Sequence, residues 1–189
     1  MIIDDVMTDK ITLHGLGFVQ IQLPASKRLH IWHPDLPRRS CFEHSSIHDH
    51  RFDFMSTVLI GSMRNIEYGD IPADDGEYVL YLHEGARSAN GGRPWTPDGR
   101  SNMVSLNDDV IHAGGGYRQQ AYKYHRTEPQ GDGKVATLMF KTWEGSSVGA
   151  HSTCRFGTEP DTDFDRYQWS SAKLWEIVSD VLLGQRVTP

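Results

Sequence analysis

The chain has 189 residues, of which 38% are hydrophobic and 10% are aromatic, and its formal net charge is −6. This length and apolar content suffice for one domain with its own core, so we expect a single domain over residues 1–189. The acidic balance argues against a nucleic-acid partner, and no apolar stretch approaches the roughly 20 residues that cross a bilayer.

The N-terminal stretch MIIDDVMTDK carries acidic residues where a signal peptide carries basic ones, and it lacks a long apolar segment. We therefore expect a cytoplasmic protein. In a reducing cytosol the two cysteines, Cys41 and Cys154, are expected as free thiols, although the sequence leaves a bridge between them open.

Strand patterns fill the first three quarters of the chain, with apolar and polar residues alternating between short turn segments rich in Gly and Asp. We expect strands at residues 17–23, 28–32, 47–54 with 56–60, 62–68, 77–83, 102–106, 120–127 and 135–143. Many short strands at near-regular spacing favour an antiparallel sandwich or barrel over βαβ units.

The remaining chain is expected to hold two irregular stretches and one helix. Residues 84–102 and 144–163 are rich in Gly, Ser and Pro, and loops of this length are often lids or binding loops. From about residue 170 to 184, apolar residues recur at helical spacing, with a serine to cap the start and Gly184 to end the helix. We expect this amphipathic helix to pack on the outside of the sheets.

Two histidines, His48 and His50, stand two residues apart in a strand-like run. Side chains alternate across a strand, so both imidazoles should reach one point in space, as a divalent metal requires. By the same alternation, Phe52, Phe54 and Ser56 should share the face of these ligands and form a wall beside the metal.

A catalytic metal usually has at least three protein ligands, so a third histidine is needed. The two candidates are His125, which follows a Gly-rich turn, and His112, which precedes a Gly triplet. The other histidines have no metal-like neighbour and are expected at the surface or in packing roles: His14, His30, His33, His44, His83 and His151.

The spacing of these residues resembles that of the cupin superfamily. Its first motif places a Gly about ten residues after H-x-H, as Gly61 follows His50, and its second motif runs from a Gly to a His eleven positions later, as from Gly114 to His125. The resemblance covers about residues 40–143. It implies an all-β fold, a double-stranded β-helix of jelly-roll type with a core over about 17–143 and a C-terminal α-helix.

Within that superfamily, SSIHDH closely resembles the metal-binding stretch of the thiol dioxygenases, the cysteine dioxygenase group, and NDDVIH and HRTEP resemble two later segments of that group. This second resemblance implies His112 as the third ligand, whereas the cupin motif implies His125. We favour His125 because a Gly-rich turn before Tyr-x-Tyr-His suits a strand that enters the barrel.

The chain departs from the cupin pattern at Phe54, which stands where a Glu ligand is common. Asp53 is adjacent but should face the other side of a regular strand unless a bulge turns it inward. Met55 stands near the position of the cross-linked Cys of cysteine dioxygenase. The expected site is therefore all-histidine, with Fe(II) as the expected metal and Zn, Ni or Mn as alternatives.

These features favour a non-haem iron(II) oxygenase, thiol-dioxygenase-like, that acts on a small polar molecule. The alternatives are a metal-dependent lyase or isomerase, and a non-catalytic cupin that binds a small molecule or sugar. Arg64 is the first choice for binding an anionic substrate, and Tyr117 is a candidate hydrogen-bond donor. Further candidates are Arg51, Arg118, Arg126 and Tyr81. Cupins often pair through their sheets, so a homodimer is one expected arrangement.

Overall fold

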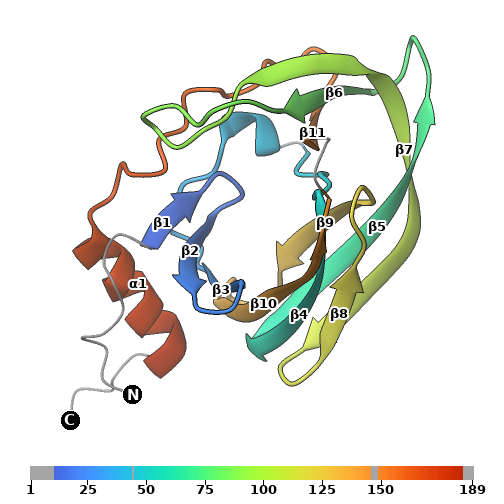
Figure 1. Ribbon diagram of the computed structural model, residues 1–189. Coiled ribbons are helices and arrows are strands. Elements are labelled where there is room, and N and C mark those ends of the chain that lie inside the picture. The colour runs from blue at the N-terminus through green and yellow to red at the C-terminus, as the bar shows by residue number, and fades with distance from the viewer. Residues whose placement is uncertain (1–10, 44, 146–148, 185–189) are drawn as a thin grey trace.

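The computed structural model describes residues 11–43, 45–145 and 149–184, and its strands form two curled antiparallel sheets that face each other (Figure 1). In spatial order, the first sheet contains β1 (Ile11–His14), β2 (Phe18–Leu23), β3 (Lys27–Trp32), β10 (Val135–Glu144), β4 (Phe52–Ile60) and β8 (Gly116–Gln119). The second contains β11 (Ala150–Arg155), β6 (Tyr78–His83), β7 (Trp95–His112), β5 (Ser62–Pro72) and β9 (Tyr124–Pro129). The predicted all-β jelly roll with a C-terminal helix is confirmed.

Alternation of side chains explains how the sheets acquire two different faces. Along β4 the buried residues are Phe52, Phe54, Ser56 and Val58, and the residues between them are half-buried or exposed. The strand is antiparallel to β10 on one side and to β8 on the other. One face of β4 therefore looks into the sandwich, and the other faces outward.

Several strand boundaries differ from those expected. The predicted strand at 120–127 is confirmed from Tyr124 onward, as part of β9, but its first half is wrong: β8 ends at Gln119 and a turn with Tyr122 at φ 58° follows. The two stretches expected to be irregular contain the start of β7 and all of β11. The strand β1 was not predicted, and it is held by antiparallel pairing with β2.

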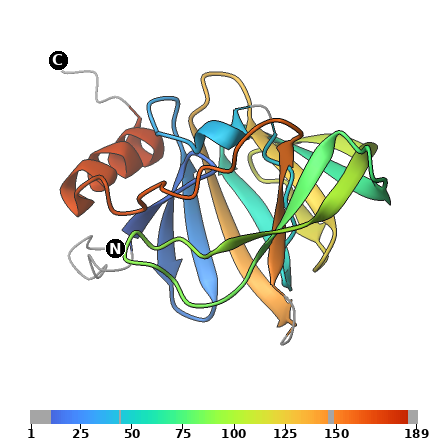
Figure 2. The same ribbon diagram turned by 90° about the horizontal axis from the view of Figure 1, so that it is seen from above.

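The helix α1 (Ser171–Leu183) matches the prediction and lies outside the sandwich, beside β1 (Figure 2). The Ser170 side chain accepts a hydrogen bond from the Lys173 backbone N–H, and Gly184 ends the helix at φ 70°. The apolar face of α1 is buried against the first sheet through Leu174 and Val178, in a cluster that also contains residues of β1 to β3. Among the described residues, the structure contains no helix with the length and apolar character needed to cross a bilayer.

The other half of the sandwich is hollow. A cavity of about 290 Å³ lies between the sheets, and its lining comes from both of them as well as from the loops at 33–51 and 84–94. This volume lies near the lower end of the range for small-molecule sites. The fold thus combines a packed end under α1 with an open end that can hold a ligand.

Candidate metal centre

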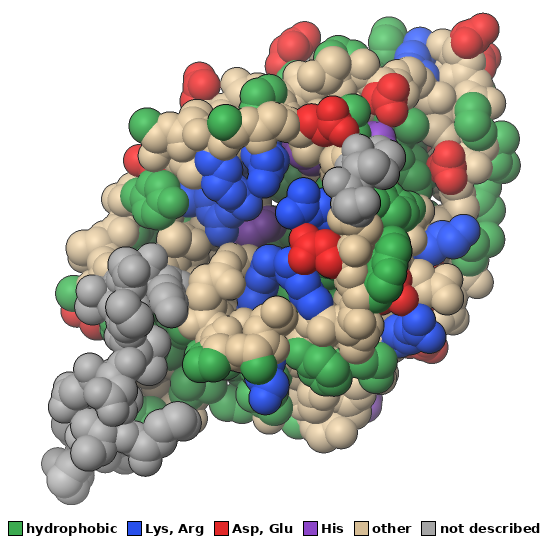
Figure 3. All heavy atoms as spheres, viewed as in Figure 1, with side chains coloured by type: hydrophobic (Ala, Val, Ile, Leu, Met, Phe, Trp, Pro, Cys, Tyr) green, Lys and Arg blue, Asp and Glu red, His purple; other side chains and the backbone are tan. Residues whose placement is uncertain are grey.

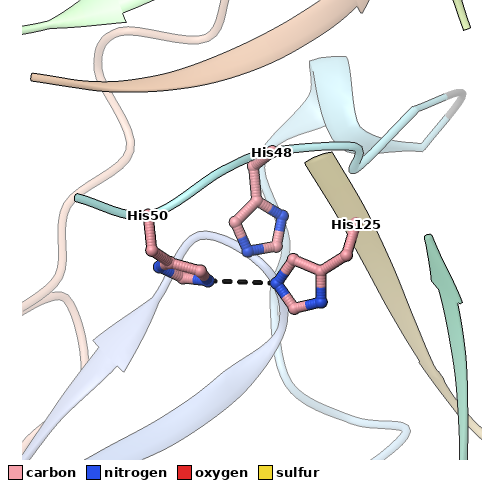
Figure 4. Close-up of side chains that lie close together, drawn as sticks. All are labelled: His48, His50 and His125. Atoms are coloured by element: carbon pink, nitrogen blue, oxygen red, sulfur yellow. Dashed lines mark hydrogen bonds between the residues drawn. The ribbon is translucent and has the colours of Figure 1, made fainter. Parts of the chain in front are cut away.

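Three histidine side chains, His48, His50 and His125, point toward one another inside the cavity (Figure 4). Each offers one ring nitrogen, and these three atoms lie within 4.8 Å of one another. The Nε2 atoms of His50 and His125 are 3.0 Å apart. The sequence predicted this set, and the structure brings it together.

The backbone that carries His48 and His50 is not a regular strand, so the predicted strand through these residues is wrong. β4 begins only at Phe52, and His48 instead forms isolated bridges with His125 and Ser152. The His48 N–H donates to the His125 carbonyl at 2.9 Å, and the His125 N–H donates back at 2.8 Å. Because the segment stays extended, the two histidines still point the same way.

Asp49, between the two histidines, anchors the segment from the opposite side. Its buried carboxylate accepts hydrogen bonds from the His151 backbone N–H and, at 3.1 Å, from the His151 ring Nδ1. The hydrogen bond to Asp49 raises the pKa of His151, and Asp98 adds to this effect. The ligand-bearing segment is thus fixed between β9 and β11.

In two of the three rings, the nitrogen that does not face the centre has a hydrogen-bond partner, and this partner fixes the tautomer. His48 Nδ1 lies 2.8 Å from the Ser46 carbonyl oxygen, and His125 Nδ1 lies 2.9 Å from Asn65 Oδ1. An oxygen of either kind only accepts, so each Nδ1 carries the proton and each Nε2 has a free lone pair. Partners of this kind orient metal-binding histidines in proteins.

Burial keeps the three imidazoles neutral. It lowers the pKa values of His50 and His125 well below the usual range, and it also lowers that of His48. The neighbouring histidines disfavour protonation further, because a second positive charge would lie close by. A neutral imidazole is the form that binds a metal.

The geometry fits a transition metal. Two nitrogens that each lie about 2.1 Å from a metal are roughly 3 Å apart when they meet at a right angle, as the Nε2 atoms of His50 and His125 are. Asp53 does not reach the centre: it pairs with Arg118 at 2.8 Å and accepts from the Ala121 N–H at 2.8 Å. Within the described parts of the chain, the donor set is three imidazoles.

The predicted wall of the site is present, because Phe52, Phe54 and Ser56 all line the cavity. The Phe54 ring meets the His50 ring edge-on, with 5.1 Å between centroids. Tyr117 also lines the cavity, and burial raises its pKa to about 12 despite a hydrogen bond with Ser56. Tyr117 is therefore protonated at neutral pH.

Other expected site residues lie elsewhere. Arg64 does not line the cavity, and it pairs on the protein surface with Asp108 at 2.6 Å and Glu128 at 3.3 Å. His112 is exposed, and its Nδ1 lies 2.8 Å from the Ser62 hydroxyl, so the structure does not place it with the other ligands. The alternation along β5 and β7 explains both positions, since each faces outward from its sheet.

Of the remaining candidate residues, some line the cavity and others do not. Arg118 pairs with Asp53 and Arg126 with Glu128, and neither arginine lines the cavity. Tyr81 packs in the core, whereas Arg51 does line the cavity. Cys41 and Cys154 are both buried free thiols outside the cavity lining.

Sequence reasoning missed most of the basic residues of the cavity, which Figure 3 shows gathered around its mouth. These residues are Arg28, Arg39, Arg87, Arg93, Lys141 and Arg166. They come from distant parts of the chain, so no local motif marks them. One signal was available for Arg28, which alternates with His30 and Trp32 on a predicted strand.

No protein-family model and no curated protein matches this chain. Among solved structures, the chain is similar to the hydroquinone 1,2-dioxygenase PnpCD in complex with Cd2+ and 4-hydroxybenzonitrile, at 16% identity and a TM-score of 0.34, over 68% of this chain and 64% of that one. It is also similar to the L-ribose isomerase of Acinetobacter sp. DL28 in complex with L-ribose, at 15% identity and a TM-score of 0.35, over 82% of this chain and 64% of that one. This chain thus spans less than two thirds of either structure, and at these levels neither identifies its reaction.

Proposed function

We propose that this protein is a metal-dependent cupin whose three-histidine centre holds iron(II) and oxygenates a small polar molecule. The observation that carries the proposal is the convergence of three neutral imidazoles, His48, His50 and His125, with no carboxylate among the described donors. An all-imidazole set with open positions suits a metal that must bind other molecules beside its protein ligands.

Iron(II) in this set would supply redox chemistry with dioxygen, and the chain's own residues would orient and shield it. The Ser46 carbonyl and Asn65 hold the His48 and His125 rings in place. Phe52 and Phe54 form an apolar wall that limits water near the centre. Tyr117 keeps its proton and can donate a hydrogen bond to a bound molecule.

The Tyr117 hydroxyl also bears on the alternatives. A metal-dependent lyase or isomerase needs a base to remove a proton from its substrate, and such a base works best with a pKa near the working pH. Burial raises the pKa of Tyr117 to about 12, which makes it a poor base at neutral pH. This argues against a lyase or isomerase that uses Tyr117 as its base.

A small thiol is the first substrate class to test. The stretch from Ser45 to His50 resembles the thiol dioxygenases, and the all-histidine donor set agrees with that resemblance in residue type, although its third member is His125 and not the His112 that the resemblance implies. The cross-link of cysteine dioxygenase has no counterpart at Met55, which is exposed on the outer face of β4. Thiol oxidation here would therefore proceed without that modification.

The test is oxygen consumption by protein loaded with either iron(II) or zinc, supplied with a panel of small thiols and other small polar molecules. We expect consumption with iron and none with zinc, with loss in His125→Ala and retention in His112→Ala. Turnover without oxygen, supported by zinc, would establish a lyase or isomerase instead. No turnover with either metal would indicate a binding protein.

A further inference from the structure

The wall of the cavity is strongly basic, although the whole chain is acidic with a net charge of −6. The space-filling view shows Lys and Arg side chains around the hollow, with histidine at its base (Figure 3). The basic residues of the lining are Arg28, Arg39, Arg51, Arg87, Arg93, Lys141 and Arg166, and the acidic ones are Asp49 and Glu144. The average composition therefore does not explain this concentration of positive charge.

The two acidic residues of the lining are already engaged. Glu144 pairs with Arg51 at 3.0 Å and with Lys141 at 3.0 Å, and Asp49 is bound to His151. The other five arginines of the lining form no ion pair with a carboxylate among residues 11–43, 45–145 and 149–184. Four of them donate hydrogen bonds to oxygens of the chain, but none has a carboxylate in direct contact: Arg39, Arg87, Arg93 and Arg166 bind the Asp161, Gly91, Gly85 and Leu13 carbonyls.

One strand contributes a row of alternate residues to the wall of this space. Arg28, His30 and Trp32 alternate on β3 and all line the cavity. The Nε2 of His30 and the Nε1 of Trp32 are buried in that wall and have no hydrogen-bond partner in the part of the chain that the structure describes. A buried polar group without a partner is costly, so the polar wall of the cavity is not completed by the described chain alone.

This row ends next to the metal centre. The Arg28 guanidinium lies over the Phe52 ring, 5.3 Å from its centroid, and the Phe52 ring lies 5.0 Å from the His50 ring. A molecule bound to Arg28 would therefore lie close to the histidines.

The arginines also disfavour one another's charge. Burial lowers the pKa of Arg28; nearby Glu144 opposes this effect, and nearby Arg87 and Arg51 add to it. Burial, with nearby Arg87, lowers the pKa of Arg166 to about 10. A bound anion would relieve this repulsion, because charge-assisted hydrogen bonds to a guanidinium favour its charged form.

We propose that the cavity binds a small organic oxyanion with at least two negative charges, carboxylate or phosphate, held by Arg28 together with the other arginines of the lining that form no ion pair with a described carboxylate. The cavity volume of about 290 Å³ limits the molecule to a small metabolite. Five guanidiniums without a carboxylate partner exceed what a single negative charge can neutralise. That this anion is the substrate of the metal centre rests on the proposed function; binding of the anion does not.

Isothermal titration calorimetry at low salt tests the proposal with four probes: malonate, inorganic phosphate, pyrophosphate and the neutral malonamide. We expect at least one anion to bind and malonamide not to bind, and the malonate and phosphate arms distinguish the two oxyanion types. The same titration on metal-free His125→Ala protein separates the two proposals. Anion binding that survives in this variant would support the inference independently of the metal, whereas failure of the wild-type protein to take up metal would contradict only the proposed function.

Variants locate the site. Arg28→Met is expected to lower the affinity for the anion by about tenfold or more, because it removes a charge-assisted contact. Arg87→Met should lower the affinity by less. Because Arg87 is exposed, this variant is expected to fold normally, so the test does not depend on Arg28→Met alone. Arg118→Met is the matched control, since Arg118 pairs with Asp53 outside the cavity. Equal weakening by Arg118→Met, or no binding of any anion to the wild-type protein, would overturn the proposal.

Discussion

Arg28 in the cavity differs from the paired arginines on the outer surface of the sandwich. Outside, Arg64 pairs with Asp108, and Arg118 pairs with Asp53. Inside, Arg51 pairs with Glu144, but Arg28 has no carboxylate partner among the described residues although it is half-buried. Burial makes an unpaired charge more costly, so pairing would be expected for Arg28 more than for the outer arginines. This difference is the one expected if a bound anion, as proposed above, completes the charge of Arg28.

Histidines show the same contrast. On the outer side, His33 contacts Asp180 of α1 at 3.0 Å, and His112 contacts the Ser62 hydroxyl. In the cavity, His48 and His125 bind the Ser46 carbonyl and Asn65 through Nδ1, and the Nε2 of His125 meets another member of the shared centre, His50 Nε2, at 3.0 Å. The difference separates histidines that complete the fold from histidines that are completed by a ligand.

The largest expected effect comes from exchanging an inner histidine for an outer one. His125→Ala should abolish tight metal binding, because two imidazoles alone hold a transition metal weakly. His112→Ala should leave metal affinity within a few-fold of the wild type. Competition with a chromogenic chelator measures both affinities. Loss of metal in His112→Ala alone would show that the inner and outer histidines have been assigned the wrong way round.

The next effect concerns the residue that orients an inner histidine. Asn65→Leu removes the acceptor 2.9 Å from His125 Nδ1 and should lower metal affinity by about 10- to 100-fold, with the ligands themselves intact. Asn107→Leu, at an exposed position on β7, is the control. The same chelator assay applies, and an unchanged affinity in Asn65→Leu would mean that this hydrogen bond does not orient the ligand.

A smaller effect is expected on stability. In metal-free and anion-free buffer, Arg28→Met should leave the free energy of unfolding unchanged or raise it by up to about 1 kcal/mol, because it removes an unpaired cation and keeps an apolar stem. Arg64→Met should lower stability instead, since it leaves Asp108 without its partner and removes one of the two partners of Glu128. Urea unfolding at low salt measures both. A clear loss of stability in Arg28→Met would contradict the contrast between inner and outer arginines.

The smallest expected effect on stability concerns the ion pairs between α1 and the first sheet. Lys134 and then His33 lower the pKa of Asp180 below its ordinary value of 3.8. A depressed pKa contributes stability that is present above the ordinary value and is lost as pH falls through the folded-state value. Asp180→Asn should therefore cost less than about 1 kcal/mol at neutral pH, and the cost should vanish in acid. Thermal melts of the wild-type protein and of Asp180→Asn across the acid range measure the difference in stability between them. A difference that persists at the lowest pH would contradict this account.

The sequence predicted those parts of the fold that carry a local pattern. The alternation in β2 and β3 and the helical spacing in α1 mark regular elements, and the structure has these elements where they were expected. By contrast, β11 has the sequence AHSTCR, whose buried residues include polar ones. Its conformation comes from antiparallel pairing with β6, which no local pattern encodes.

The site was predictable to the same extent. His48 and His50 are close in sequence, and a motif spacing pointed to His125. The basic cavity was not predictable, because Arg28 and Arg166 are separated by most of the chain and meet only when the sandwich closes. Arg64 was a reasonable choice by residue type, but its face of β5 depends on strand register, which the sequence did not specify.

The most direct test of the central claim is the metal content of protein purified without a histidine tag and then reconstituted with iron(II). We expect about one equivalent of transition metal in the wild-type protein and almost none in the variant that combines His48→Ala and His125→Ala, since one imidazole cannot hold the ion. Elemental analysis by mass spectrometry provides both values. Less than about a tenth of an equivalent in the wild-type protein, before and after reconstitution, would contradict a metal centre at these histidines.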